Sequence, residues 1–137
     1  MRKRTRSRHA DTPLFRPLSA KQLADVDRVV TTLDVHAGKQ LMRQGQSGRE
    51  FIVIADGHAE VQHDGQVIAV RGPGTFIGET SLLLDRPRNA SVVARTDMTI
   101  DVIDRQGFRW LLQRYPRLHA PLLAATAQRL AEIDHSV

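Results

Sequence analysis

Residues 76–94 read FIGETSLLLDRPRNASVVA, in which Gly78 and Glu79 precede a short apolar run and Arg88 follows nine positions after the acid. A glycine directly before a short helix leaves the backbone N–H groups of its first turn accessible to an anion. The guanidinium of Arg88 is permanently charged and matches the geometry of phosphate oxygens, whereas Glu79 can accept hydrogen bonds from sugar hydroxyls. The stretch therefore predicts a pocket for a ribose and a phosphate.

Two segments of this stretch, GETSLL at 78–83 and PRNASV at 87–92, resemble the phosphate-binding cassette of cyclic nucleotide-binding domains. The acid and the arginine stand at the spacing of this family, which includes the catabolite activator protein and the regulatory subunit of protein kinase A. The resemblance extends from about Leu14 to Ile133 and implies an antiparallel β-roll that binds a cyclic nucleotide. Thr80 departs from the family pattern because it is polar where an apolar residue is usual.

The resemblance also implies roles for individual residues. Arg88 would bind the phosphate, Glu79 would accept a hydrogen bond from the ribose 2′-hydroxyl, and the last helix would contact the base. The implied ligand-binding residues are Ile77, Gly78, Glu79, Thr80, Ser81, Leu82, Arg88, Asn89, Ala90 and Val92, and the implied base contacts are Leu130, Ile133 and His135. Taken by itself, Arg88 has a plainer alternative, which is a surface ion pair with Glu79 or Asp85.

The residue after the cassette arginine bears on the choice of base. Alanine or serine at this position resembles family members that prefer cAMP, and threonine resembles members that accept cGMP. Asn89 matches neither pattern. We expect cAMP as the ligand, with cGMP as the alternative, and no cofactor.

The chain before the cassette changes its hydrophobic period. Ser19 and Gln22 form a capping-box pattern, and apolar residues at three- and four-residue steps predict a helix over 20–32. From Asp34 onward, short alternating runs are separated by turns with glycine, and Asp64-Gly65 indicates a tight hairpin. This pattern predicts an antiparallel sandwich, jelly roll or barrel.

The chain after the cassette returns to helices. Two strands are predicted at 90–94 and 98–103, and Asp104 can cap a helix that runs to Arg114. A last helix is predicted from Pro116, and Pro121 either kinks it or marks its true beginning. The predicted fold is therefore mainly β, an antiparallel β-roll or jelly roll of about eight strands, with an N-terminal helix, a short cassette helix and two C-terminal helices.

The positive charge of the chain is concentrated at its N-terminus. The chain of 137 residues has the size of one domain, and its formal net charge is +5. Six of the 20 Lys and Arg residues and one of the 15 acidic residues fall within 1–16, so the remainder carries 14 of each sign. We expect a disordered basic tail at 1–13, with weak attraction to nucleic acid or anionic surfaces, and a cyclic nucleotide-binding domain at 14–137.

Several kinds of chemistry are excluded or disfavoured by composition. The sequence has no cysteine, which excludes disulfides, thiolate metal sites and cysteine nucleophiles. Six histidines occur without the His-x-His pair of cupin-type metal sites, so we expect no metal site. No catalytic constellation is found, and residues 78–81 lack the lysine of a phosphate loop. The absence of an apolar leader or membrane span makes a cytoplasmic location the default expectation.

The expected function is that of a non-enzymatic sensor. It would bind cAMP and relay occupancy through its C-terminal helix to an effector protein, and that helix would also offer a surface for a homodimer. Three alternatives are a nucleic-acid-binding adaptor in which the basic tail dominates, an interaction scaffold whose pocket has lost its ligand, and a regulatory piece of a longer enzyme, channel or transporter. Met1 argues for a natural start, whereas nothing in the sequence argues for a natural end.

Overall fold

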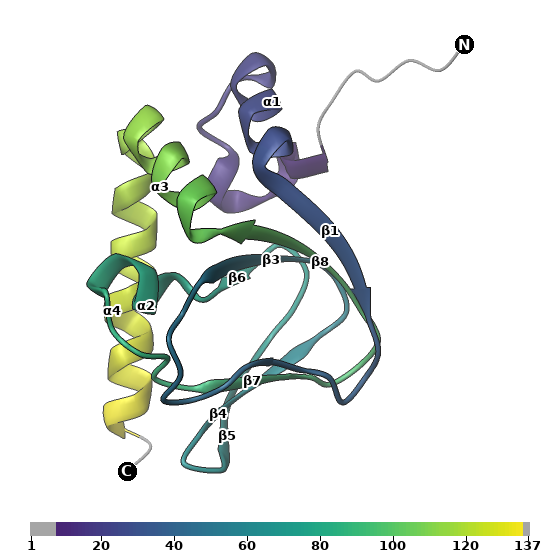
Figure 1. Ribbon diagram of the computed structural model, residues 1–137, viewed down its shortest axis with the longest axis vertical. Coiled ribbons are helices and arrows are strands. Elements are labelled where there is room, and N and C mark those ends of the chain that lie inside the picture. The colour runs from purple at the N-terminus through teal and green to yellow at the C-terminus, as the bar shows by residue number, and fades with distance from the viewer. Residues whose placement is uncertain (1–7, 136–137) are drawn as a thin grey trace.

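A computed structural model describes residues 8–135, apart from the side chains of residues 8 and 135 (Figure 1). Its strands are β1 (Val30–Val35), β2 (Gln40–Met42), β3 (Glu50–Asp56), β4 (Ala59–His63), β5 (Gln66–Arg71), β6 (Phe76–Ile77), β7 (Ser91–Ala94) and β8 (Met98–Asp104). Its α-helices are α1 (Ala20–Val29), α2 (Glu79–Leu84), α3 (Arg105–Arg114) and α4 (His119–His135). Short 3-10 helices are η1 (Arg8–Asp11), η2 (Pro13–Phe15) and η3 (Pro116–Leu118).

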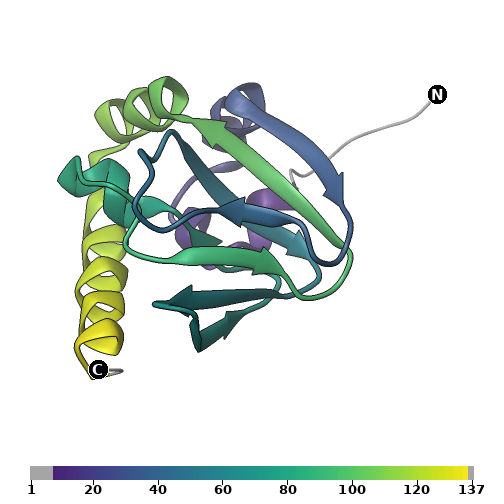
Figure 2. The same cartoon turned by 60° about the horizontal axis from the view of Figure 1, so that its bottom comes forward.

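The strands form two antiparallel sheets of four strands each within the described part of the chain. The strand order is β1-β8-β3-β6 in one sheet and β2-β7-β4-β5 in the other. Helices α1 and α3 cover the outer face of the first sheet, and α4 runs along one end of the roll beside α2 (Figures 1 and 2). The predicted β-roll of about eight strands with flanking helices is confirmed.

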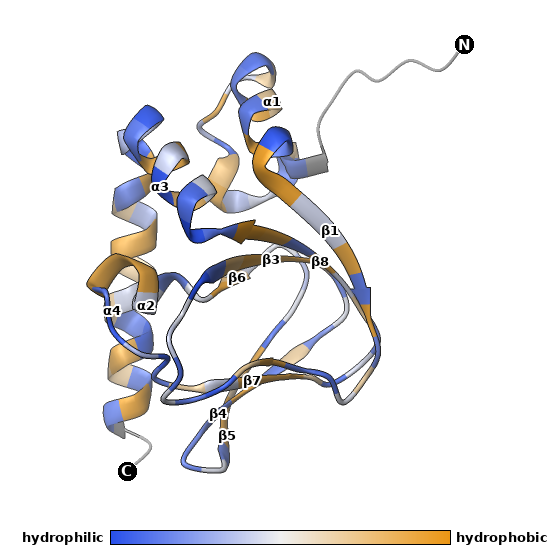
Figure 3. Ribbon diagram, viewed as in Figure 1, coloured by the Kyte–Doolittle hydropathy of each residue, from blue (hydrophilic) through white to orange (hydrophobic). Residues whose placement is uncertain are grey.

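Strand β3 is buried on both faces and joins two hydrophobic cores. Phe51 and Val53 pack into the core beneath the helices, whereas Ile52 and Ile54 pack between the two sheets. Successive side chains of a strand point to opposite faces, so a continuous apolar run satisfies both cores at once. In Figure 3 the hydrophobic colour accordingly runs along β3 and β8, between the helices and the second sheet.

Helix α1 begins as predicted and ends earlier than predicted. The capping box is present, because Ser19 Oγ accepts from the Gln22 N–H at 3.2 Å and Gln22 Oε1 accepts from the Ser19 N–H at 2.9 Å. The helix ends at Val29 rather than at residue 32, and the following residues pair with β8 from Val30 to Val35. The β-branched run at 29–32 favours the extended conformation once a partner strand is available.

The segment before α1 is more ordered than predicted. Residues 8–13 were expected to belong to a disordered tail, but η1 and the start of η2 occupy them. His9 is buried, with Nε2 at 3.6 Å from Asp101 Oδ2 on β8 and 3.7 Å from Asp27 Oδ1 on α1. The tail prediction is therefore wrong for residues 8–13, and residues 1–7 lie outside the described chain.

Polar caps and turns agree with several sequence predictions. Asp104 Oδ1 accepts from the Gly107 N–H at 2.7 Å and caps α3. Pro121 lies in the first turn of α4, where no intrahelical partner is needed for its missing N–H, so it marks the beginning of that helix. Asp64 and Gly65 both have positive φ, at 51° and 81°, which confirms the tight hairpin between β4 and β5.

An acid on α1 connects the first helix to the end of α3. Asp25 Oδ2 accepts from the Tyr115 hydroxyl and, at 2.8 Å, from Arg114 Nε. The hydrogen bond from Tyr115 is the main cause that lowers the pKa of Asp25, and Arg114 lowers it further. Asp25 in turn raises the pKa of Tyr115.

No helix within residues 8–135 is both long enough and apolar enough to cross a membrane.

Two turn glycines, Gly57 between β3 and β4 and Gly65 in the β4–β5 hairpin, allow a matched test of packing. Gly57 and Gly65 have φ of 87° and 81°, but a Cβ on Gly57 would overlap the Asp97 carbonyl, whereas a Cβ on Gly65 meets nothing within 4 Å. We expect Gly65→Ala to lower the free energy of unfolding by about 1 to 2 kcal/mol through backbone strain alone. Gly57→Ala should lower it by about 2 to 5 kcal/mol, because steric overlap adds to that strain. Urea unfolding measures both, and equal losses would contradict the turn geometry.

The Asp25 contacts predict a stability change that depends on pH. Tyr115→Phe should lower the midpoint of thermal unfolding by several degrees at pH 7, because it removes a donor to a charged carboxylate. Because the pKa of Asp25 is lower in the folded state than its unfolded value of about 4, the ionised carboxylate stabilises the fold above that value. This stabilisation is lost as the pH falls through the folded-state pKa. The deficit of Tyr115→Phe should therefore shrink below about pH 4. Arg28→Gln is the control, because Arg28 is exposed and its Nη1 lies 3.6 Å from Asp25 Oδ1. A Tyr115→Phe deficit in the unfolding midpoint that does not change with pH would contradict the prediction.

Candidate functional site

Gly78 sets the entry to the cassette helix α2. Strand β6 pairs with β3 through Ile77 and Ile52, and the chain then leaves the sheet at Gly78 with φ of 94°. A Cβ at Gly78 would lie 2.7 Å from the Glu50 carbonyl oxygen, so both the conformation and the space require glycine. As a result, Glu79 begins the helix with its side chain turned inward and only 1% exposed.

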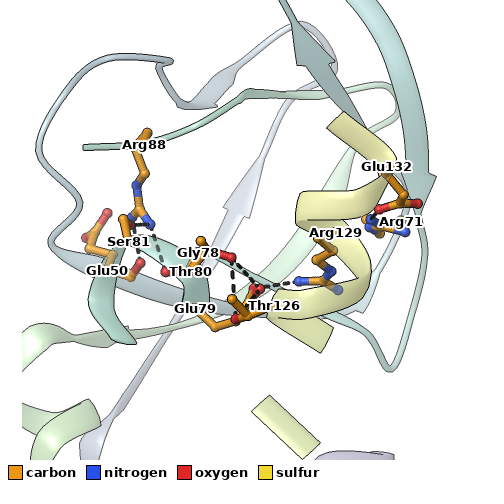
Figure 4. A network of polar contacts seen from close by, with 10 residues as sticks. All are labelled: Glu50, Arg71, Gly78, Glu79, Thr80, Ser81, Arg88, Thr126, Arg129 and Glu132. Atoms are coloured by element: carbon orange, nitrogen blue, oxygen red, sulfur yellow. Dashed lines mark hydrogen bonds and ion pairs between the residues drawn. The ribbon is translucent and has the colours of Figure 1, made fainter. Parts of the chain in front are cut away.

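Arg88 is buried against the start of α2 and the start of β3. Its Nη1 donates to the Gly78 carbonyl at 2.9 Å and to Ser81 Oγ at 2.6 Å, and its Nη2 donates to the Glu50 carbonyl at 2.6 Å (Figure 4). The alternative of a surface ion pair is wrong, because Arg88 is 9% exposed and Asp85 instead lies 3.5 Å from Arg105.

The hydrogen bonds of Arg88 leave part of its guanidinium for a ligand. Three of its five N–H groups are used by the contacts within residues 8–135. The N–H of Nε and one N–H of Nη2 remain. A guanidinium with two donors left over can bind phosphate oxygens.

Gly48 is a part of the site that the sequence analysis missed. A Cβ on Gly48 would overlap Ser81 Oγ and would lie 2.9 Å from Arg88 Cζ. The backbone at Gly48 therefore packs directly against the guanidinium of Arg88. The available signal was a second glycine three residues after Gly45, in the segment between β2 and β3.

Glu79 connects the cassette to the last helix. Its Oε1 accepts from Arg129 Nη1 at 2.5 Å, and its Oε2 accepts from Thr80 Oγ1 at 2.9 Å and from Thr126 Oγ1 at 3.4 Å (Figure 4). The guanidinium of Arg129 also lies 4.8 Å from the ring centroid of Phe76, within the range of a cation–π contact. The carboxylate of Glu79 therefore binds two residues of α4.

A second ion pair ties α4 to the edge of the second sheet. Arg71, the last residue of β5, donates from Nη2 to Glu132 Oε1 of α4 at 2.7 Å. Figure 4 shows this pair and Arg88 on opposite sides of Glu79. Sequence reasoning named neither Arg71, Arg129 nor Glu132. The available signal was helical phase, since Arg129 lies three residues, or about one helical turn, after Thr126.

These side chains line one cavity between α2, the second sheet and α4. Nine of the ten predicted cassette residues line it, and Leu82 instead packs against the core beneath the helices. Of the predicted base contacts, Ile133 lines the cavity, Leu130 does not, and the side chain of His135 lies outside the described residues. The cavity is lined by Met42, Val61, Ile68, Arg71, Ile77, Gly78, Glu79, Thr80, Ser81, Arg88, Asn89, Ala90, Val92, Arg129, Glu132 and Ile133.

The charges that line the cavity do not cancel. Three guanidiniums, of Arg71, Arg88 and Arg129, face two carboxylates, of Glu79 and Glu132, which leaves one positive charge. Burial is the main cause that lowers the pKa of Arg88 and of Arg129, because the charged form is removed from water. An arginine stays charged at neutral pH even so. The lining residues therefore favour an anionic ligand.

Metal ligands do not gather in the described part of the chain. Within it, no group of three or more His, Asp or Glu side chains is placed to hold a metal ion. The polar side chains of the cavity are instead donors and acceptors suited to hydroxyl and phosphate groups.

Several known proteins are similar to this chain in sequence. The sequence model described as "Cyclic nucleotide-binding domain" matches residues 32–115. The cAMP-dependent protein kinase regulatory subunit of Aspergillus fumigatus is 34% identical over 105 residues, which cover 74% of this chain and 25% of that protein. The cGMP-dependent protein kinase egl-4 of Caenorhabditis elegans is 29% identical over 100 residues, which cover 73% of this chain and 13% of that protein. The chain thus spans a quarter or less of these two relatives.

Solved structures agree in fold. The catabolite activator protein of Thermus thermophilus is 30% identical with a TM-score of 0.77, over 90% of this chain and 61% of that one. The cAMP-bound PfPKA-R has a TM-score of 0.80 at 22% identity, over 91% of this chain and 44% of that one. The family resemblance carried by residues 78–92 is confirmed by these matches and by the architecture. The chain belongs to the cyclic nucleotide-binding domain family.

Proposed function

We propose that this cyclic nucleotide-binding regulatory domain takes cAMP into the cavity beside α2 and reports its presence through α4, without catalysing a reaction. The main support for this proposal is the burial and hydrogen bonding of Arg88. Its guanidinium is buried and held by three hydrogen bonds to Gly78, Ser81 and Glu50, yet two of its N–H donors are left over. Such a group is positioned before the ligand arrives, so little side-chain ordering accompanies binding.

The charge of the cavity supports a cyclic phosphate over an open one. A cyclic phosphodiester carries one negative charge, which would neutralise the single excess positive charge of the lining residues. A 5′-monophosphate carries a charge of about −1.5 to −2 at neutral pH and would leave an excess of negative charge in a partly buried site.

Glu79 has the capacity to hold the sugar. A carboxylate accepts about four hydrogen bonds, and Glu79 accepts three, from Arg129, Thr80 and Thr126. Oε1 has one partner and keeps a lone pair for a hydroxyl. A ribose 2′-hydroxyl would thus join a network whose donors already orient the carboxylate.

The same network supports a relay to α4. A ligand can shift the position of a helix only if it binds the two positions with different affinity. Glu79 would contact the ligand, and it already binds Thr126 and Arg129 of α4. Occupancy would therefore change the contacts that hold α4, and an effector protein would read that change. Some relatives are regulatory subunits of a kinase, which favours a kinase-type effector.

Other parts of the expected function stay predictions. The relatives include both cAMP- and cGMP-dependent kinases, so they do not decide the base. A homodimer through α4, a contact of the basic N-terminus with nucleic acid or anionic surfaces, and a cytoplasmic location also stay predictions.

The role of Arg88 can be tested by calorimetry with cAMP, cGMP and 5′-AMP. Arg88→Lys should weaken cAMP binding by about tenfold or more, because a point charge cannot reproduce the donors of a planar guanidinium. Arg95→Lys is the matched control, since Arg95 lies 3.5 Å from Glu60 and does not line the cavity. Equal cAMP affinity of Arg88→Lys and the wild type would remove Arg88 from the site, and no binding of either cyclic nucleotide would favour an interaction scaffold.

The role of Glu79 can be tested with a modified sugar. The wild type should bind 2′-deoxy-cAMP more weakly than cAMP by about tenfold or more, because a hydrogen bond to a charged acceptor is lost. Glu79→Gln should narrow that difference, since its neutral oxygen accepts a weaker bond. Thermal unfolding of the variant checks that the fold survives. Equal affinities of the wild type for the two ligands would show that Glu79 does not hold the hydroxyl.

A further inference from the structure

An excess of positive charge gathers on the helices that cover the first sheet. Residues 105–118, which include α3 and η3, contain four arginines and no acid, and residues 16–29 contain three basic residues and two acids. Residues 30–104, which include all the strands and the cassette, instead contain seven Lys and Arg against ten Asp and Glu. Positive and negative charge are therefore separated between the helical layer and the β-roll.

Five exposed cations of this layer form one surface, which we call the basic face. Its members come from α1, from the end of α3 and from the segments next to them, and they are Arg16, Lys21, Arg28, Arg114 and Arg117. Lys21 and Arg28 lie on the same side of α1, because they are seven residues or about two turns apart. Arg114 reaches this side of α1 and donates from Nε to Asp25 Oδ2 at 2.8 Å. Arg117 donates from Nη1 to the Pro17 carbonyl at 3.0 Å, which places it beside Arg16.

The fold itself does not account for all of these charges. Arg28 and Arg114 lie in the last turns of α1 and α3, where a cation stabilises the helix end, and both lie within 4 Å of Asp25. Lys21 lies in the first turn of α1, where the helix dipole disfavours a cation. Among the described side chains, no carboxylate lies within 4 Å of Lys21, Arg16 or Arg117. These three cations are therefore available to an anionic partner.

We propose that the basic face binds nucleic acid through the phosphate backbone, without regard to base sequence. A nucleic acid presents closely and regularly spaced negative charges, and cations that neutralise them release counterions into the solvent. Four of the five cations are arginines, whose planar guanidinium can donate two parallel hydrogen bonds to phosphate oxygens. Arg114 is also held in place by Asp25 and lies 5.5 Å from the ring centroid of Trp110, so little ordering accompanies its contact with a phosphate.

The lack of exposed apolar side chains on this surface argues against a protein or a membrane as the partner. The exposed large hydrophobic residues of the described chain all lie on other elements, and they are Leu33, Val67, Val70, Leu84 and Leu123. A protein interface has an apolar centre, and a helix that lies in a membrane surface buries an apolar side. Interfaces with nucleic acid are more polar and much more positively charged, as the basic face is.

The basic face is separate from the cyclic nucleotide cavity. None of its five residues lines that cavity. Figure 1 shows α1 and α3 on the outer face of the first sheet, whereas the cavity lies between α2, the second sheet and α4. Both surfaces can therefore be occupied in the same molecule, and binding to one can be measured without the other.

The test measures binding of a short, fluorescently labelled DNA duplex by anisotropy over a series of salt concentrations. For the wild type, the logarithm of the association constant should fall with the logarithm of the salt concentration with a slope of about −4 or steeper. The variant Arg16→Gln/Lys21→Gln/Arg117→Gln should have a slope that is shallower by about 3, because each phosphate contact contributes about 1.

A matched control removes the same net charge elsewhere. The variant Lys39→Gln/Arg43→Gln/Arg95→Gln changes three exposed cations in and beside β2 and β7 of the second sheet and should keep the wild-type slope. Both triple variants should unfold at about the wild-type temperature, since surface substitutions change stability little. Both should also bind cAMP with the affinity of the wild type, because none of the six residues lines the cavity.

Four results would overturn the proposal. These are no binding of the duplex by the wild type at low salt, an equal loss in the two triple variants, an unchanged slope in the variant of the basic face, and equally tight binding of a polyglutamate peptide. The second would reduce binding to net charge, the third would assign it to residues 1–8, which hold five further basic residues, and the fourth would indicate an acidic protein as the partner. Each would leave cyclic nucleotide binding in place, which the titration with cAMP measures separately.

Discussion

A buried guanidinium must donate hydrogen bonds in several directions at once, and Arg88 arranges the site by doing so. Its bonds to the carbonyls of Gly78 and Glu50 and to Ser81 hold together the turn into α2, the start of β3 and the first turn of the cassette helix. Gly48 and Gly78 lack side chains where this group needs space. The positive φ of Gly78 then turns Glu79 inward, so the position of the acid follows from the same packing constraint.

The polar network continues from Glu79 into the last helix. Arg129 and Thr126 reach the carboxylate from α4, and Glu132 reaches Arg71 at the end of β5. Buried polar groups are expensive unless they are satisfied, so each ion pair restricts where α4 can lie. The helix that would report the ligand is thus held by groups that also line the ligand cavity. Under the proposed function, binding and relay would be two consequences of one network.

The local features of the fold could be predicted from the sequence because they depend on short-range physics. The capping box at Ser19, the cap at Asp104 and the hairpin at Asp64-Gly65 each involve residues within a few positions of one another. The end of α1 could not be placed in the same way. Residues 30–32 can extend either a helix or a strand, and pairing with β8 about 70 positions away decides for the strand. His9 likewise joins the fold through Asp101, a residue far along the chain.

The sequence by itself determined the family, the cassette and the identity of most residues that line the cavity around α2 and Arg88, because these residues follow one another within 77–92. Only the tertiary structure decided what completes the cavity. Arg129 meets Glu79 across 50 positions, and Glu132 meets Arg71 across 61. In the sequence, Arg129 and Glu132 look like residues of an ordinary solvent-exposed helix face. Neither the composition nor the hydrophobic period of this segment shows which side of α4 faces the sheet. The phase of α4 is set by Leu122 and Thr126, which are buried, and that packing brings Arg129 and Glu132 to the cavity.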